Sequence, residues 1–378
     1  MSVKPRMADV AKLAGVSVAT VSLVLNNTGR RISDRTQQRV WQAAHELGYI
    51  RDATARTLRM GKSHSIGFIS SEVTLTRFAS DMLQGILEAA DERDHAVMIM
   101  ETGESDAAIN DAVRALRGRQ VDAILIGVMA SRDLQLDPPT AGLPCVVLNS
   151  TAAGYRAFLP QEFEAGRAAV RALTQRGHQR IGFVGRQRLD NLYRGSVNIG
   201  ARMQGIDAQL AAENLHFAHE VESLEWEPEV GYEGTLEVLH AAPETTAVLA
   251  ANDRIAFGVY QAAAELGLKI PTDLSVMSFD DEELAALMRP GLSTLRLPYY
   301  EMGRLGVAAV LDEVPSMDAA ATSLGAESAP QTAGAQTTGE QTTPATQTTA
   351  PTQTTAQQIL QLPLSPVWRE SIASRDSK

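Results

Sequence analysis

Residues 17–26, SVATVSLVLN, carry side chains of the kinds that contact double-stranded DNA. Small and apolar side chains can pack on a thymine methyl group or another base edge, and hydroxyl and amide groups can hydrogen-bond to phosphate or sugar. The candidates for base edges are Val18, Ala19, Ser22 and Leu23, and those for phosphate or sugar are Ser17, Thr20 and Asn26. The alternative for Val18 and Leu23 is simple core packing, although Val21 and Leu25 already fill the inward face.

Two short helices joined by a turn must position these side chains. Apolar residues recur at helical spacing on both sides of a glycine: Val10, Leu13 and Ala14 before it, Val21 and Leu25 after it. Gly15 supplies the turn residue, and Ser17 suits the N-cap of the second helix, since its hydroxyl can accept an orphan backbone N–H. A third helix is expected from the N-cap Ser33 to about Leu47, where Gly48 ends it. This pattern predicts a helix-turn-helix domain over residues 1–50.

The charge of the chain is unevenly distributed. Residues 1–62 carry 11 Lys or Arg against 4 Asp or Glu, a balance of +7. Because the whole chain has a net charge of −11, the remainder carries −18. A small basic module on an acidic body suits a protein of which one end meets phosphate while the rest stays away from it. A solvated charged surface is the alternative.

The sequence after Ser63 alternates short apolar runs with amphipathic helices. Strands are expected at 65–71, 96–102, 121–128 and 144–150, and again at 180–185, 247–252 and 274–280, with helices between them. Two such sets predict an α/β body of two doubly wound subdomains with parallel sheets. A ligand would bind in the crevice at the carboxyl ends of the strands.

A segment of low complexity interrupts this body. Residues 319–357 are rich in Thr, Gln, Ala, Pro and Gly, and QTT recurs at Gln336, Gln341, Gln347 and Gln353. With almost no apolar bulk, they are expected to be a disordered insertion, because the strand-like ILQLPLSPVWRES follows. A partner-binding tail is the alternative. The predicted subdomains are then 65–160 with 292–318, and 161–291 with 358–374.

The sequence offers little support for a membrane protein, a disulfide framework or an enzyme. No apolar run approaches the roughly 18 residues of a membrane span, so a cytoplasmic location is expected. The single cysteine, Cys145, lies in the apolar stretch PCVVL and is expected to be a buried structural thiol.

Enzyme motifs fail on their spacing, so no catalytic residue, cofactor or metal is predicted. No G-x-G-x-x-G follows a strand, no G-x-S-x-G occurs, and Arg56 stands where a phosphate loop ending at the GKS of Gly61 would need its first glycine. His216 and His219 have no third partner nearby, and we expect them to be exposed to solvent.

Several motifs in the same order resemble the lactose-repressor family of bacterial transcription regulators. They are DVAKLAGVSVATVSLVLN, HELGY, ARTLR, RGHQRIGFVG, AANDRIAFGV and IPTDLSVMSFDD, and together they cover nearly the whole chain apart from the insertion. The resemblance implies a headpiece that reads DNA and a periplasmic-binding-protein-like body that clamps a small molecule. Position 23 differs from the family pattern, because this chain has Leu23 where most family members have Arg. Arg can pair bidentately with guanine, whereas Leu can only pack on an apolar edge.

The resemblance also implies a hinge over residues 51–64. In the family this segment becomes helical when two copies meet in the minor groove. Leu58 would then wedge into a base step, with Ala55 and Arg56 lining the groove. A plain interdomain linker is the alternative.

In the body, the resemblance places an effector site at the strand ends. Arg202, Asn252 and Asp280 match the principal ligand contacts, and such a set of groups suits the hydroxyls of a sugar or nucleoside. Trp226 matches an aromatic residue that stacks on sugar, with partly buried packing as its alternative. Asn149, Tyr299 and Ser71 match further wall positions. The alternative for Asp280 is a helix cap.

Together these features predict a homodimeric repressor that binds a palindromic operator under the control of a small-molecule effector, for which a sugar is expected. The residues after Ser371 are few and polar, so a leucine-zipper tetramer is not expected. The alternative is a sugar-binding protein of the same fold that does not use DNA.

Overall fold

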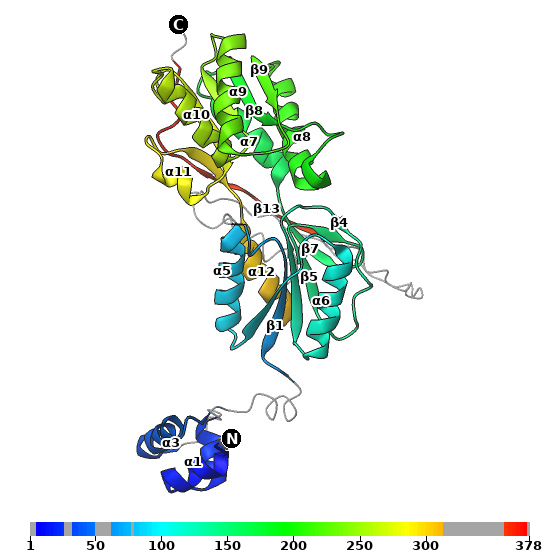
Figure 1. The fold of residues 1–378 in the computed structure, drawn as a ribbon, viewed down its shortest axis with the longest axis vertical. Coiled ribbons are helices and arrows are strands. Elements are labelled where there is room, and N and C mark those ends of the chain that lie inside the picture. Colours follow the sequence, from blue (N-terminus) through cyan, green and yellow to red (C-terminus); the bar gives the residue numbers. More distant parts are fainter. Residues whose placement is uncertain (1–4, 26–31, 50–61, 77–78, 313–358, 376–378) are drawn as a thin grey trace, which may run out of the picture. The chain divides into compact units, whose positions relative to one another are not determined.

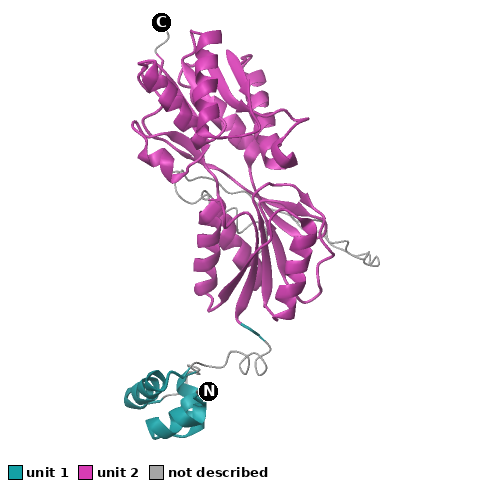
Figure 2. Cartoon of the chain, viewed as in Figure 1, with its two compact units in different colours: residues 1–63 teal, residues 64–378 magenta. Residues whose placement is uncertain are grey.

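The structure is a computed structural model in which the chain divides into two units, residues 1–63 and 64–378 (Figure 2). It describes residues 5–25, 32–49, 62–76, 79–312 and 359–375. The predicted roles of Asn26, Ala55, Arg56 and Leu58, and the predicted insertion at 319–357, lie outside the described residues.

The first unit contains three helices, as predicted: α1 (Met7–Ala14), α2 (Val18–Leu25) and α3 (Asp34–Glu46). Its core is formed by Val10, Ala11, Ala14, Val21, Val24, Leu25, Val40, Ala43 and Ala44. Leu13, expected to share this core, is about half exposed instead, because its side chain falls on the outer face of α1. Gly15 adopts φ +63° and ends α1, which is the left-handed conformation that a turn there requires.

The second unit consists of two α/β lobes (Figure 1). The first lobe is built on a sheet of order β13-β7-β5-β3-β1-β2, in which every pair is parallel. Its strands are β1 (Ser65–Ser71), β2 (Ala96–Glu101), β3 (Ala123–Val128), β5 (Cys145–Leu148), β7 (Arg156–Pro160) and β13 (Ile359–Leu362). A small ladder joins β4 (Asp133–Leu134) to β6 (Thr151–Ala152).

Helices cover both faces of the first sheet. On one face α5 (Ser80–Asp91) and α12 (Tyr299–Leu311) pack side by side, and α6 (Asp106–Gly118) lies on the other (Figure 1). The buried hydrophobic residues of this lobe form two clusters, one on each face of the sheet, because alternate residues of an apolar strand such as β3 face opposite sides. Leu125 belongs to the cluster under α5 and α12, and Ile124 belongs to the cluster under α6.

The second lobe is built on a sheet of order β14-β12-β11-β10-β8-β9. The strands are β8 (Ile181–Arg186), β9 (His219–Glu222), β10 (Ala247–Ala250), β11 (Ser275–Asp280), β12 (Ser293–Arg296) and β14 (Ser365–Val367). All pairs are parallel, as predicted, except that β14 joins β12 as an antiparallel edge strand.

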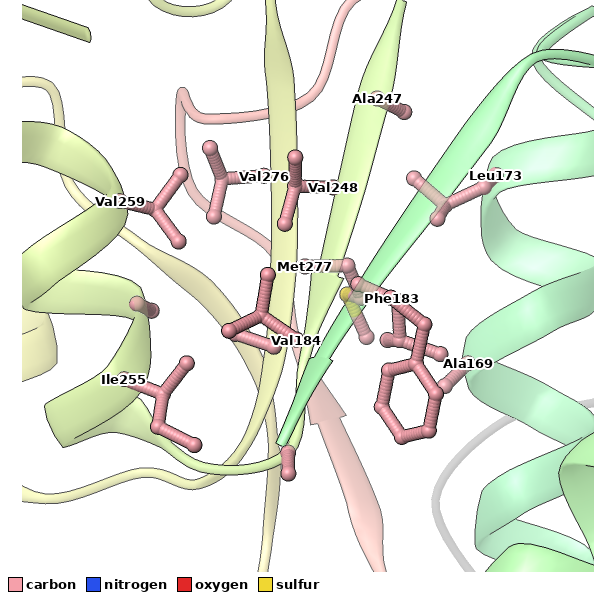
Figure 3. Close-up of a cluster of buried hydrophobic side chains, with 14 of the residues drawn as sticks. Ala169, Leu173, Phe183, Val184, Ala247, Val248, Ile255, Val259, Val276 and Met277 are labelled. Carbon is pink, nitrogen blue, oxygen red and sulfur yellow. The ribbon is translucent and has the colours of Figure 1, made fainter. Parts of the chain in front are cut away.

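Four long helices cover this sheet: α7 (Glu162–Thr174), α8 (Val197–Ala212), α9 (Pro228–Ala241) and α10 (Asp253–Glu265). The 3₁₀ turn η2 (Tyr193–Gly195) precedes α8, and the short α11 (Glu283–Leu287) follows β11. Figure 3 shows Phe183 beside Leu173 of α7, while Val259 of α10 faces the opposite side of the strands. The carboxyl ends of these strands are thereby fixed by cores on both faces.

The chain crosses between the lobes at points that the sequence predicted incorrectly. The predicted first subdomain included 292–318, yet β12 pairs with β11 in the second sheet, and only α12 packs in the first lobe. The predicted second subdomain included 358–374, yet β13 pairs with β7 in the first sheet. Strands of four residues contain too little pattern to identify their partners, which here lie far away in the sequence.

Two smaller expectations can be compared with the structure. Cys145 begins β5 and is only partly buried, although burial of its thiol raises the pKa to about 12. Among the described residues no single helix is long and apolar enough to cross a membrane, and only the pair α1 and α2, bent by 102°, passes that test by length and composition.

Candidate functional site

The predicted reading face of α2 is open to solvent. Ser17, Val18 and Ala19 are exposed, Val18 by 47%, so Val18 is not a core residue. Leu23 is half-buried, whereas Val21 and Leu25 are buried on the opposite side.

Caps and a guanidinium hold this reading helix in place. The Ser17 hydroxyl accepts the backbone N–H of Thr20 at 3.0 Å, which confirms the predicted N-cap of α2. Arg39 of α3 donates to the carbonyl of Ala14 from Nη2 at 2.6 Å and to that of Gly15 at 3.2 Å. It therefore ties α3 to the turn, a role that the sequence did not reveal. The Ser33 hydroxyl, expected to cap α3 in the same way as Ser17, is instead 3.0 Å from the hydroxyl of Thr36.

The body contains a cavity of about 720 Å³ that both lobes line. Its walls include six of the seven predicted effector residues: Asn149, Arg202, Trp226, Asn252, Asp280 and Tyr299. Ser71 is not among the described lining residues; it is buried at the end of β1, paired with Val128, and its neighbour Glu72 lines the cavity. Successive side chains at the end of a strand point to opposite sides, so a prediction that is wrong by one residue names a buried side chain in place of one in the cavity wall.

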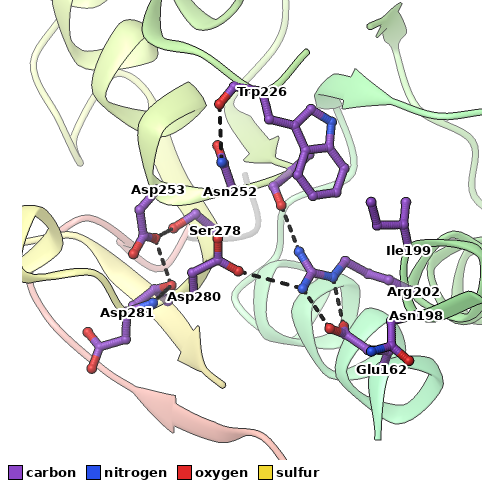
Figure 4. Close-up of polar contacts among 12 residues, drawn as sticks. Glu162, Asn198, Ile199, Arg202, Trp226, Asn252, Asp253, Ser278, Asp280 and Asp281 are labelled. Carbon is purple, nitrogen blue, oxygen red and sulfur yellow. Dashed lines mark hydrogen bonds and ion pairs between the residues drawn. The ribbon is translucent and has the colours of Figure 1, made fainter. Parts of the chain in front are cut away.

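Arg202 is the centre of a buried polar network (Figure 4). Its side chain is 4% exposed and donates to both carboxylate oxygens of Glu162, at 2.7 and 2.8 Å, and to the carbonyl of Ala251 at 2.8 Å. Asp280 lies 3.6 Å away. Burial lowers the pKa of Arg202, but the charges of Glu162 and Asp280 more than offset this, so the net pKa is raised. Three of its five N–H groups are used within the protein, so at most two remain for a ligand.

The close crossing of α7 and α8 places Glu162 beside Arg202. Gly166 of α7 faces the backbone of Arg202, and Gly205 of α8 faces the carbonyl of Phe163. A Cβ atom at either glycine would clash with that backbone, so these glycines permit the approach. Glu162 itself was absent from the prediction. A buried guanidinium needs an acidic partner, so the sequence could have indicated that Arg202 pairs with a carboxylate.

Asp280 ends β11 with φ +106°, and its side chain, 6% exposed, lines the cavity. Burial raises the pKa of its carboxyl to about 7, as do the nearby Glu282 and Glu162, while Arg202 opposes the shift. Burial also raises the pKa of the Tyr299 hydroxyl, so this tyrosine stays neutral as a possible donor. Asp280 is not the N-cap residue of a helix: α11 starts at Glu283, after its N-cap Glu282.

Asn252 and Trp226 are fixed to each other. The side-chain oxygen of Asn252 accepts the backbone N–H of Ile255 at 2.8 Å, which caps α10. The side-chain amide nitrogen of Asn252 donates to the backbone carbonyl of Trp226 at 3.2 Å. The indole N–H donates to the carbonyl of Gly185 at 2.9 Å. With its polar edge thus satisfied, the half-buried indole presents the rest of its ring to the cavity.

The two lobes meet at the cavity through polar contacts. Asn149 of the first lobe accepts from the amide of Asn198 of the second at 2.8 Å, and both residues are buried. Arg194 of η2 reaches across to Glu72 at 2.6 Å and also contacts Glu104. Asn198 and Arg194 were not predicted, because their importance depends on which lobe faces them.

No metal-binding group of three or more His, Cys, Asp or Glu occurs within the described part of the chain. His216 is exposed, as expected, whereas His219 is half-buried and contacts Glu237 at 2.8 Å.

Comparison with known proteins identifies the family of the chain. Residues 6–52 match the model of the bacterial regulatory proteins of the lacI family, and residues 170–328 match a periplasmic binding protein-like domain. The ribose operon repressor of Haemophilus influenzae is 32% identical over 312 residues, which cover 82% of this chain and 91% of that protein. The chain belongs to the lacI family. It is a DNA-binding transcription regulator, as the sequence predicted.

Further similarities agree with this membership in the lacI family. The repressor PurR of Yersinia pestis is 31% identical over 314 residues, covering 82% of this chain and 90% of that protein. The lac repressor dimer bound to operator and an anti-inducer has a TM-score of 0.68 at 24% identity, covering 98% of this chain and all of that one. A complex of the regulator CelR with cellobiose has a TM-score of 0.56 at 22% identity, covering 97% of this chain and all of that one. These two structures share the fold. The two relatives described above that are more than 30% identical are both named as repressors, and the headpiece match argues against a binding protein that does not use DNA.

Proposed function

We propose that this regulator is a cytoplasmic, non-enzymatic repressor that binds a palindromic operator as a homodimer. A sugar bound in the body cavity changes its affinity for that operator. The observation that carries the proposal is the cavity itself, which is walled by both lobes. A ligand that contacts both lobes changes the free energy of their closure, so it can shift the protein between two states.

The chemistry of the walls supports a sugar. Asp280 and the remaining N–H groups of Arg202 can hydrogen-bond to hydroxyls at the buried end of the cavity. The Trp226 ring can cover an apolar face of C–H groups. The amides of Asn149, Asn198 and Asn252 are each held by protein contacts, so they are already oriented before a ligand arrives. Among the relatives, one repressor is named for the ribose operon, and CelR was solved with cellobiose.

Control of DNA binding would pass through the hinge. In this proposal, closure of the lobes changes how the first lobe of one chain packs against the first lobe of its partner chain. This packing determines whether residues 51–64 of the two chains can pair on DNA. The residues that would contact the operator are Ser17, which caps α2, and Val18, Ala19, Thr20, Ser22 and Leu23 within it.

Calorimetric titration of the full chain with a panel of pentoses, hexoses and disaccharides tests the proposal. One sugar should bind, and Trp226→Ala should weaken it by about 1–3 kcal/mol, the value of a lost aromatic contact area. Trp368→Ala is the matched control, because Trp368 is half exposed over Arg176 and does not line the cavity. Equal weakening by both variants, or binding of no sugar, would refute the assignment.

A further inference from the structure

Among the described residues, those that line the cavity carry an excess of negative charge, which bears on which ligands can bind there. The described lining residues include five acidic residues, Glu72, Glu162, Glu225, Glu227 and Asp280, but only three cations, Arg194, Arg202 and Arg254. Even if Asp280, whose pKa is raised to about 7, is counted as neutral, the acids outnumber the cations.

Each of these cations is already paired with two carboxylates. Arg202 lies 2.7 Å from Glu162 and 3.6 Å from Asp280. Arg254 lies 3.3 Å from both Glu227 and Glu282.

Arg194 follows the same pattern, with Glu72 at 2.6 Å and Glu104 as its second partner. No lining guanidinium among the described residues is therefore left with its charge unmatched.

Glu225 adds a carboxylate at the rim of the cavity. It is exposed, directly precedes Trp226, and has no ion pair with another described residue. A ligand that lies against Trp226 would approach this charge. An anion there would be repelled, and an ammonium group would be attracted.

Two helix N-termini at the cavity contribute partial positive charge, which opposes the negative charge of the carboxylates. The helices α8 and α10 begin at the cavity, and a helix start carries about half a positive charge. However, Ser196 already caps α8 and Asn252 already caps α10 through their side chains. The unpaired Glu225 carboxylate carries a whole charge and each lining guanidinium already has two acidic partners, so the described lining residues keep a negative excess.

From this balance we infer that the effector is a sugar that is uncharged or carries an amine, and that the cavity rejects phosphorylated sugars, sugar acids and nucleotides. This inference rests on the proposed function and specifies the ligand of the same site. It assigns to Glu225 a part in ligand selection.

Matched ligands test the inference on the full-length protein. Calorimetric affinities would be measured for the sugar found in the panel, its phosphate ester and its amino derivative; if the sugar were glucose, the series would be glucose, glucose 6-phosphate and glucosamine. The ester should bind at least about tenfold more weakly than the parent, and the amine at least as well as the parent. Equal or tighter binding of the ester would overturn the inference while leaving the proposed function intact. Binding of none of the sugars would overturn both.

A charge-reversal variant separates charge from size. Glu225→Lys should reduce the discrimination against the ester severalfold, because it replaces a repulsive charge with an attractive one. Glu229→Lys is the matched control: it makes the same change at an exposed position that does not line the cavity. Discrimination that is unchanged in Glu225→Lys, or that changes equally in both variants, would mean that size and not charge excludes the ester, and the inference would fail.

Discussion

The pair of Arg202 and Glu162 should be the most costly polar contact of the body to break. Replacing Arg202 with Ala removes two charge-assisted hydrogen bonds to Glu162 and one to the Ala251 carbonyl. It leaves the Glu162 carboxylate, itself 4% exposed, without its counter-ion. A buried charge without a partner is strongly destabilising, because water cannot replace what was lost.

The expected loss is about 3–5 kcal/mol of unfolding free energy, the range for truncating one partner of a buried pair. Urea denaturation of the full-length protein followed by circular dichroism would measure it. The double variant Arg202→Met with Glu162→Gln removes both charges and should recover much of that loss. Arg304→Ala, which breaks a solvent-exposed pair with Glu92, is the control and should cost far less.

Two results would refute this reasoning. A loss below about 1 kcal/mol for Arg202→Ala would equal that of a surface pair, which the burial of both groups does not allow. A double variant as unstable as Arg202→Ala alone would show that the lost hydrogen bond to Ala251 or the lost packing, and not the stranded Glu162 charge, causes the effect.

Four further predictions concern the headpiece, the hinge and the cavity. Leu23→Arg should change the bases selected from a random operator library towards guanine, and an unaltered selection would mean that position 23 does not face the bases. Leu58→Ala should weaken operator binding about tenfold or more without unfolding the body, and unchanged affinity would remove the predicted hinge wedge. Arg39→Ala should destabilise the headpiece by about 1.5–3 kcal/mol through loss of its bonds to the turn, measurable by hydrogen exchange of α1 and α2, where unchanged protection would contradict it. The pKa of Asp280 is raised from 3.8 to about 7 in the folded protein, so its stabilising contribution is present below about pH 4 and is lost as the pH rises through 7. Asp280→Asn should therefore gain stability relative to the wild type between about pH 4 and 7, by up to about 1.4 kcal/mol per pH unit, and a flat difference over that range would contradict the shift.

Local patterns predicted the elements that have a clear period or cap. The helix-turn-helix was recognisable because Gly15 and Ser17 mark the turn and the start of α2 within four residues of each other. The strand at 65–71 was predicted with its observed bounds, since it is a continuous apolar run. By contrast β9 and α9 were missed, because HEVE is too short and polar to read as a strand and α9 is only weakly amphipathic.

What the sequence could not supply was pairing over long distances. Six of the seven residues that the family resemblance placed at the effector site line the cavity, and Asp280 and Asn252 do so at or just after the ends of β11 and β10. The partners that fix them were missed: Glu162 lies 40 residues from Arg202, and Asn198 lies 49 residues from Asn149. The assignment of β12 and β13 to the wrong lobes has the same cause, since short strands specify a face but not a neighbour.

Coupling between the cavity and the operator is the central claim, and one titration tests it most directly. Fluorescence anisotropy would give the Kd for a labelled operator with and without a saturating amount of the sugar that binds the cavity. A coupling of about 1–3 kcal/mol, or about 5–150-fold in Kd, is expected for the wild type. At a sugar concentration just sufficient to saturate the wild type, the shift in operator Kd should be smaller in Trp226→Ala, because less of the variant is occupied. An operator Kd that the bound sugar does not change would contradict the account.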